Sequence, residues 1–418
     1  TTPIKISGPA EGNARMQTAI DPEGTTVIGT FANCSGGVTP WGTVLTCEEN
    51  IDGYFYGKTD GAEAANHKRY TVGKEPFYGW HRIDERFDVS QTPTEPNRFG
   101  WVVEYDPTDP ESQPVKRTAL GRFKHETATC VVAPDGRLVV YSGDDDYFEY
   151  IYRFVSKDRV NDSDRSANEN LLDDGTLSVA HFEDDGSMRW IPLVYGENGL
   201  TEENGFTSQA DVLIEARRAG DVVKATKMDR PEGIAISPLT GEVFVSLTMN
   251  PHRKHTDAAN PRAHDKAGHI IKLIPPAGDH AAGEFLWDMH FLTGSPDDKG
   301  VNYMGRVGTA GWFANPDNLT FHPAGSLWVA TDGMPKSYGF SDGLYASDKD
   351  TLPKCFLRAP KGAEVTGPHF TPDGQTLFVS IQHPGESENS TYDHPSTRWP
   401  DFDKRLPPRP SVIAVTKA

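Results

Sequence analysis

One short hairpin signature returns along the whole chain: a turn that contains proline and glycine, followed by a short apolar strand. Proline and glycine supply the backbone angles that a tight chain reversal needs, so each copy predicts a β-hairpin. Repeated short hairpins are typical of a β-propeller or a β-sandwich. The copies are Pro40-Trp41-Gly42 with TVLTC, Pro134-Asp135-Gly136 with RLVVYS, Pro323-Ala324-Gly325 with SLWVAT, Pro372-Asp373-Gly374 with QTLFVS and the one-residue-longer Pro238-Leu239-Thr240-Gly241 with EVFVSL.

A third strand-like run often follows the hairpin, at 101–106, 150–155, 269–274 and 411–416. Five hairpin units are clear, and we expect the run TTVIGTF near the N-terminus to pair with SVIAVT at the C-terminus. That pair would close a ring. We therefore predict an all-β fold, a β-propeller of about six blades formed as one domain over residues 1–418.

The spacing between the hairpins is irregular, which indicates insertions at about 57–98, 156–228 and 385–410. These segments are rich in polar residues, and connections on a protein surface tolerate extra length. Within the second insertion, residues 208–223 predict a short helix. The alternative is a small second domain at 156–228, which we disfavour because the segment has few apolar residues.

The charge balance limits the possible partners. The 418 residues include 41 Lys and Arg against 60 Asp and Glu, a formal net charge of −19. This argues against a nucleic-acid surface and against a polybasic membrane patch. No apolar run approaches the roughly 20 residues of a membrane span. The first residues show no leader features, so we expect that any leader has been removed or left out.

Cysteine usage is sparse. Four cysteines allow at most two disulfides, too few for a disulfide scaffold in a chain of this length. For Cys34, a disulfide to Cys47 or Cys130 is the ordinary expectation, and a buried inert thiol is the next. The fourth, Cys355, lies far along the chain.

The repeats become informative when they are aligned on their turn prolines. Alternate residues of a strand share one face, and the first strand of a propeller blade lines the central channel. Residues at the same register position should therefore meet at one end of the channel. Six residues before the proline stand Cys34, Glu232, Asp317, Thr366 and Ala128, with Glu126 two residues before Ala128.

Carboxylates that converge in this way repel each other unless a cation lies between them. Oxygen ligands favour Ca²⁺ or Mg²⁺, whereas a cysteine thiolate favours a softer ion such as iron or zinc. The mixture of one thiol with several acids therefore predicts a metal site with two kinds of metal. The alternative for each acid alone is a solvated position at the rim.

The same hairpins contain further candidate site residues. Glu48 and Glu49 follow the strand after the first turn, and the aligned positions do not choose between them. Arg230 lies two residues before Glu232 and would point at the same end of the channel. Its guanidinium suits a phosphoryl or carboxylate group, although a structural ion pair is the alternative.

Five segments closely resemble the PhoX-type alkaline phosphatases, in the same order and over most of the chain. The resemblance implies a six-bladed propeller that is exported folded through the twin-arginine route to the periplasm or outside. It implies a monomer with an iron–calcium cofactor, an oxo-bridged cluster of two Fe³⁺ and several Ca²⁺. It implies hydrolysis of phosphate monoesters at alkaline pH. The segments are GTFANCSGGVTPWGTVLTCEENIDGYF at 29–55, HETATCVVAPDGRLVVYSGDD at 125–145, DRPEGIAISPLTGEVFVSLT at 229–248, NPDNLTFHPAGSLWVATDG at 315–333 and FTPDGQTLFVSIQHPGE at 370–386.

The resemblance also implies residue roles. The family's cysteine ligand to iron falls on Cys34, and its substrate-contacting arginine falls on Arg230. Glu386 enters by resemblance alone, since from the residues it lies in a polar tail. The family's carboxylate ligands fall on Glu48 or Glu49, Glu126, Glu232, Asp317 and Glu386.

The leading hypothesis is therefore a metal-dependent phosphomonoesterase acting on small-molecule phosphate monoesters. A calcium-dependent lactonase-like propeller hydrolase is the first alternative, but it gives no role to Cys34. The second alternative is a non-catalytic propeller in which Ca²⁺ only ties the blades together.

Overall fold

The computed structural model describes residues 2–74, 76–306, 311–348 and 351–417. The chain divides into two compact units. The first comprises Thr1–Phe182, Met188–Lys227 and Asp279–Glu284, and the second comprises Glu183–Ser187, Met228–Gly278 and Phe285–Ala418. The single-domain organisation stays a prediction, and each unit is described by itself.

Strands dominate both units, and the α-helices are short. The strands are β1 Pro3–Ser7, β2 Thr26–Ile28, β3 Asn33–Val38, β4 Val44–Glu48, β5 Val102–Tyr105, β6 Val115–Arg117, β7 Thr129–Val132, β8 Arg137–Gly143, β9 Ile151–Arg159, β10 Gly175–Phe182, β11 Ser187–Pro192, β12 Pro231–Ile236, β13 Val243–Leu247, β14 His269–Ile274, β15 Glu284–Leu292, β16 Asn302–Tyr303, β17 Pro316–Phe321, β18 Leu327–Thr331, β19 Gly343–Ser347, β20 Lys354–Arg358, β21 Glu364–Phe370, β22 Thr376–Gln382 and β23 Ser411–Thr416. The α-helices are α1 Ala64–Arg69, α2 Gln209–Ile214, α3 Ala216–Val222 and α4 Met334–Tyr338. Short 3₁₀ turns span Ala14–Met16, Ile51–Tyr54, Trp80–Arg82, Glu85–Phe87, Glu95–Arg98, Thr118–Leu120, Arg165–Asn168, Glu202–Asn204 and Pro276–Gly278.

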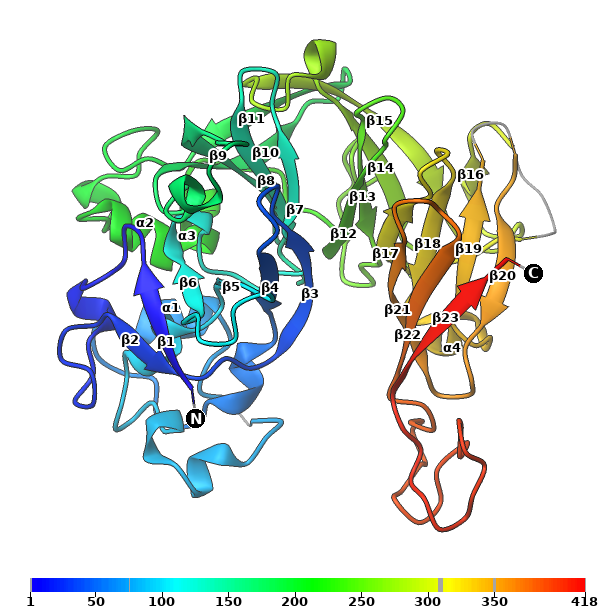
Figure 1. Ribbon diagram of the computed structural model, residues 1–418, viewed down its shortest axis with the longest axis horizontal. Helices are drawn as coiled ribbons and strands as arrows, with labels where there is room; N and C mark the ends of the chain where they lie inside the picture. The colour runs from blue at the N-terminus through cyan, green and yellow to red at the C-terminus, as the bar shows by residue number, and fades with distance from the viewer. Residues whose placement is uncertain (1, 75, 307–310, 349–350, 418) are drawn as a thin grey trace. The chain divides into compact units, whose positions relative to one another are not determined.

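The first unit contains a sheet with the strand order β2-β1-β6-β5-β4-β3 (Figure 1). Strands β3 to β6 follow one another as antiparallel neighbours, and β1 joins the outer strand β6 in parallel. The predicted closing pair is wrong. Strand β2 pairs with β1, and the C-terminal β23 pairs with β22. A nearby hairpin partner costs less chain entropy than a distant one.

The insertion at 156–228 is built into the core of the first unit. Ser208 caps α2 by accepting a hydrogen bond from the backbone of Asp211, and the non-helical Glu215 separates α2 from α3. This confirms the predicted helical segment. The expectation of few apolar residues is wrong, because many side chains of the insertion share one core with β8 and β9: Leu171, Leu172, Leu177, Val179, Leu193, Leu200, Phe206, Val212, Leu213, Ala216, Ala219 and Ala225.

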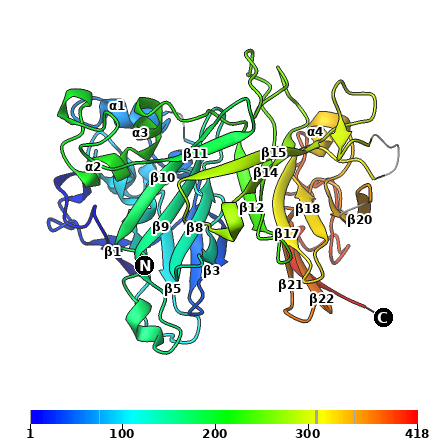
Figure 2. The ribbon, with the colours of Figure 1, turned by 90° about the horizontal axis from the view of Figure 1, so that it is seen from above.

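The second unit is built from antiparallel strands that pair with their neighbours in chain order (Figure 2). One sheet has the order β17-β18-β19-β20, another has the order β21-β22-β23, and β12, β13, β14 and β15 pair in succession. Strand β17 packs beside β12 on one side and beside β21 on the other. The first strands of three successive hairpins therefore lie next to one another.

A half-buried histidine in the second unit makes its stability depend on pH. His290 stacks on Phe291 and meets the ring of Phe244 edge-on. Burial, together with the neighbouring Lys272, lowers the pKa of His290 from 6.5 to about 4.

Because the folded pKa is the lower one, the stabilisation is complete above pH 6.5 and is lost as the pH falls towards 4. We measure the free energy of unfolding by urea at several pH values between 6.5 and 4. Over this range, the wild type should lose up to about 3 kcal/mol more of this free energy than His290→Phe. If the unfolding free energies of the two proteins change equally with pH, His290 is not the source of the pH dependence.

Candidate metal centre

Four first strands carry one extra residue relative to the strand that follows them. In β3, β12, β17 and β21, the pairing with the next strand shifts by one residue near the start of the strand. Such a β-bulge leaves residues out of the regular ladder and redirects their side chains. The breaks lie between Asn33 and Gly36, between Pro231 and Ile234, between Pro316 and Leu319, and between Thr366 and His369.

The first residue inside each break is Cys34, Glu232, Asp317 or Gly367. The position six residues before the turn proline coincides with the first three of these residues, but in the last hairpin it falls on Thr366 and not on Gly367. The break in β21 lies one residue closer to its turn, so the fixed offset misses it. Strict alternation of faces also fails at these positions, because a bulge interrupts it.

A left-handed backbone conformation recurs two residues before the first residue inside three of the breaks. Ala32, Arg230 and Asn315 all have positive φ angles, of 54°, 59° and 53°. This left-handed conformation is costly for residues other than glycine and is often found at functional sites. The same backbone shape therefore introduces Cys34, Glu232 and Asp317.

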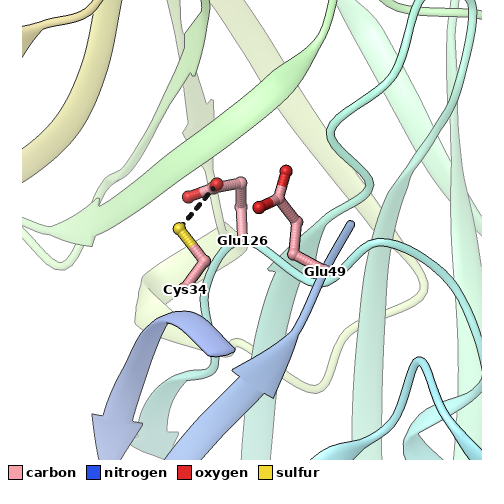
Figure 3. Close-up of side chains that lie close together, drawn as sticks. All are labelled: Cys34, Glu49 and Glu126. Atoms are coloured by element: carbon pink, nitrogen blue, oxygen red, sulfur yellow. Dashed lines mark hydrogen bonds between the residues drawn. The ribbon is translucent and has the colours of Figure 1, made fainter. Parts of the chain in front are cut away.

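In the first unit, Cys34, Glu49 and Glu126 point toward one another (Figure 3). One ligand atom from each lies within 4.8 Å of the others, and the Cys34 thiol donates a hydrogen bond of 3.0 Å to Glu126. Glu49 and Glu126 are buried, whereas Cys34 is exposed. A thiol beside two buried carboxylates is a donor set for a metal ion.

Glycines allow the first strands to approach each other closely. A Cβ at Gly37 would lie 1.9 Å from the carbonyl oxygen of Ala128, and one at Gly233 would lie 2.4 Å from that of Asp317. Neither distance is possible, so only glycine fits. The glycine of β3 thus brings Cys34 and Glu126 together, and that of β12 brings Glu232 and Asp317 together.

Glu48 has a different environment from its neighbour Glu49. Its carboxylate and the ammonium of Lys116 form a 2.7 Å ion pair with both side chains fully buried. The carboxylate also accepts hydrogen bonds from Thr30 and from the backbone of Gly100 and Trp101. The structure thus places Glu49 with Cys34 and Glu126, and it places Glu48 in a buried ion pair.

Glu48 precedes one member of the cluster, Glu49, and contacts the chain neighbours of the other two. Residue Asn33, next to Cys34, pairs with Glu48 across the sheet. The backbone N–H of His125, next to Glu126, donates to the Glu48 carbonyl, and Glu49 is the following residue. The ion pair with Lys116 therefore anchors the segment from which the cluster is built.

Loss of Lys116 should be costly. Lys116→Met leaves the Glu48 carboxylate buried without its cation, and removing one partner of such a pair costs about 3–5 kcal/mol of unfolding free energy. We expect a loss of this size in urea unfolding. In the control Lys58→Met, which breaks the exposed pair between Lys58 and Asp60, we expect no measurable change. Equal effects of the two substitutions would contradict the anchoring role.

In the second unit, Glu232 and Asp317 are buried, and a carboxylate oxygen of one lies within 4.8 Å of an oxygen of the other. The Arg230 guanidinium forms a 2.9 Å ion pair with Glu232. The Asn318 amide donates to Asp317 over 2.7 Å, and its oxygen accepts the N–H of Gly367. Sequence reasoning missed Asn318, although it directly follows Asp317 and fills the rest of the break.

Glu386 is exposed, unlike the buried acids of its unit. Its side chain is 71% exposed, and its neighbour is His383 at 3.6 Å. Among the described residues, no group with metal-binding geometry includes it. Its role as a ligand stays a prediction that rests on resemblance.

The other cysteines are poor ligands. All four cysteines are described, and none is in a disulfide. Burial raises the pKa of Cys47 well above its ordinary value and, with Glu104, that of Cys130 to about 12, so both stay protonated. Cys355 is exposed on β20. The disulfide expected for Cys34 is not formed.

Comparisons with known proteins identify a family and a related solved structure. The family model described as alkaline phosphatase PhoX matches residues 1–385. The solved structure of Pseudomonas fluorescens PhoX in complex with vanadate, a transition state analogue, is 42% identical. That match covers 100% of this chain and 74% of the other, with a TM-score of 0.92. It confirms the predicted all-β propeller fold.

Other similarities are weak. A gluconolactonase from Xanthomonas campestris is 13% identical over 91% of this chain and 82% of its own, with a TM-score of 0.32. Kuenenia stuttgartiensis hydrazine synthase is 12% identical over 92% and 84%, with a TM-score of 0.35. Nothing about this chain rests on these two. The search of curated proteins found no match. Within the described residues, no helix has the length and apolar character to cross a membrane.

Proposed function

This chain belongs to the alkaline phosphatase PhoX family, which makes it a metal-dependent phosphatase of small-molecule phosphates, and we propose that it hydrolyses phosphate monoesters at a mixed iron–calcium centre. The observation that carries the proposal is the Cys34 thiol beside Glu49 and Glu126. A thiol in the cluster distinguishes this proposal from a purely calcium-dependent hydrolase, whose ion prefers oxygen ligands alone.

The donor set fits the proposed metals. Two carboxylates that are buried side by side repel each other unless a cation neutralises them. Iron accepts both thiolate and carboxylate, whereas calcium accepts oxygen only. We propose that Cys34, Glu49 and Glu126 bind iron, and that Glu232 and Asp317 contribute oxygen ligands for calcium. Glu386 is a further proposed calcium ligand.

When bound, the cations supply the positive charge that offsets the phosphoryl oxygens in the transition state. Arg230 is proposed to donate two hydrogen bonds to the non-bridging oxygens, since a guanidinium matches this geometry. Its ion pair with Glu232 holds the side chain at the start of β12 before substrate arrives. Asn318 fixes the Asp317 carboxylate in one orientation.

Location and assembly follow from family membership and are also proposals. We infer that the protein is exported to the periplasm or outside, and that it acts as a monomer. The net charge of −19 supports the absence of nucleic-acid partners.

The test is substitution of a proposed ligand with a matched control. Glu126→Gln keeps the shape of the side chain but removes its charge. We expect loss of iron, measured by elemental analysis of protein purified without chelator, together with a fall of at least about 100-fold in hydrolysis of p-nitrophenyl phosphate. The exposed Glu23→Gln should behave as wild type. Phosphatase activity that persists in iron-free Glu126→Gln would overturn the proposal.

A further inference from the structure

A second group of potential ligands lies in the second unit, on residues that the proposed function does not use. Asp229 precedes β12, His269 begins β14, and Asp265 lies in the connection between β13 and β14. One ligand atom from each lies within 4.8 Å of the others. All three residues are buried.

The tautomer of His269 is fixed by its surroundings. Its Nε2 lies 2.9 Å from the carbonyl oxygen of Ala259, which can only accept, so Nε2 carries the proton. In the neutral form of the ring, the Nδ1 lone pair then faces the carboxylates. This atom is buried and has no hydrogen-bond partner among the described residues. The nearest Asp265 oxygen is 3.8 Å away, too far for a hydrogen bond.

Both carboxylates are held in place by hydrogen bonds and by an ion pair with an arginine. Asp229 accepts a 2.5 Å hydrogen bond from Arg253 through Oδ1, and its Oδ2 has no hydrogen-bond partner among the described residues. Asp265 accepts backbone hydrogen bonds from Ala267 and Gly268, and one of 2.9 Å from Arg262. Hydrogen bonds of this kind orient the carboxylates that bind a metal ion.

The charged side chains at and beside this group carry a net negative charge. Arg253 also faces Asp257 at 3.6 Å. Arg253 and Arg262 balance the charges of Asp229 and Asp265, and the partly exposed Asp257 adds one further negative charge beside Arg253. A lone pair and two carboxylates directed at one buried space are unfavourable without a positive charge between them.

We propose that Asp229, Asp265 and His269 bind a divalent transition-metal ion of the Zn²⁺ type. An imidazole nitrogen with two carboxylates suits zinc, whereas calcium prefers oxygen ligands only. The ion ties the connection between β13 and β14 to the residue next to Arg230. The proposal is independent of the proposed function, since it uses none of the same ligands.

The experiment measures zinc in the full chain after dialysis against Zn²⁺ and then against metal-free buffer. We compare wild type, His269→Gln, Asp229→Asn and the control His255→Gln, an exposed histidine in the same connection. Wild type and control should retain one zinc more than the two site variants. Calorimetric titration should show that each site variant weakens this binding by about 100-fold or more. Circular dichroism checks that each variant folds.

Crystals of the zinc-treated wild type, measured at the zinc absorption edge, give a direct second readout. An anomalous peak between the three side chains supports the proposal, even when a variant does not fold. Equal zinc content in wild type and His269→Gln, or no peak at this place, would overturn it. Protonation of Nδ1 in the zinc-treated protein, seen by ¹⁵N NMR of the ring, would also overturn it and would identify the cation as a proton.

Discussion

Cys34→Ser should lose its iron and its visible colour while the protein stays folded. A thiolate is the soft ligand of the proposed set, and its charge transfer to Fe³⁺ absorbs visible light. Because the Cys34 side chain is exposed, it contributes little to the core. We expect iron to fall close to zero and the phosphatase rate to fall by about 100-fold or more.

Elemental analysis, the visible spectrum and circular dichroism measure these three properties on one sample. The matched control is Cys355→Ser, which replaces another exposed cysteine and should keep both iron and colour. If Cys34→Ser retains the colour, the chromophore is held by other residues and the assignment of iron to Cys34 is wrong.

Arg230→Ala should retain its metals and lose its activity. A guanidinium does not ligate a cation, so metal content should stay at the wild-type level. If the side chain acts mainly in the transition state, hydrolysis of p-nitrophenyl phosphate should slow by about 10²–10³-fold in kcat. Arg230→Lys should recover only part of this, because an ammonium lacks the two-pronged geometry.

The neighbouring Glu232→Gln is the informative contrast. Arg230 and Glu232 are ion-paired at 2.9 Å, so each substitution breaks the same pair. Only Glu232→Gln should also weaken the retention of calcium, because only Glu232 is a proposed ligand. Near-normal turnover in Arg230→Ala with its metals bound would mean that Arg230 is a structural ion-pair residue.

The repeated hairpins were predictable because each depends on local turn chemistry. Alignment of the hairpins on their turn prolines then picked out Cys34, Glu232 and Asp317, because their strands place the bulge at the same distance from the turn. It failed at Thr366, where that distance changes by one residue. A bulge has no reliable sequence signature, so the offset could not be corrected from the sequence alone.

Other parts of the site depend on residues far apart in the chain. The choice between Glu48 and Glu49 is informed by Lys116, 68 residues from Glu48, and no pattern near either glutamate indicates that partner. The pair of terminal strands was predicted from strand-like runs near the two chain ends and from the closure of a ring, but β2 has a closer partner in β1. His269 escaped notice because it reads as the first residue of an apolar strand, HIIKLI.

The breaks in β3, β12, β17 and β21 free one position per strand from the requirements of strand pairing. Below each break the strand pairs regularly with the next strand, but the first residue inside the break makes no paired contact with that strand. A thiol, two carboxylates and a glycine occupy this position at 34, 232, 317 and 367 without changing the sheet beside them. Substitution can thus alter the ligand set one hairpin at a time, and a descendant could exchange its metal while inheriting the same scaffold.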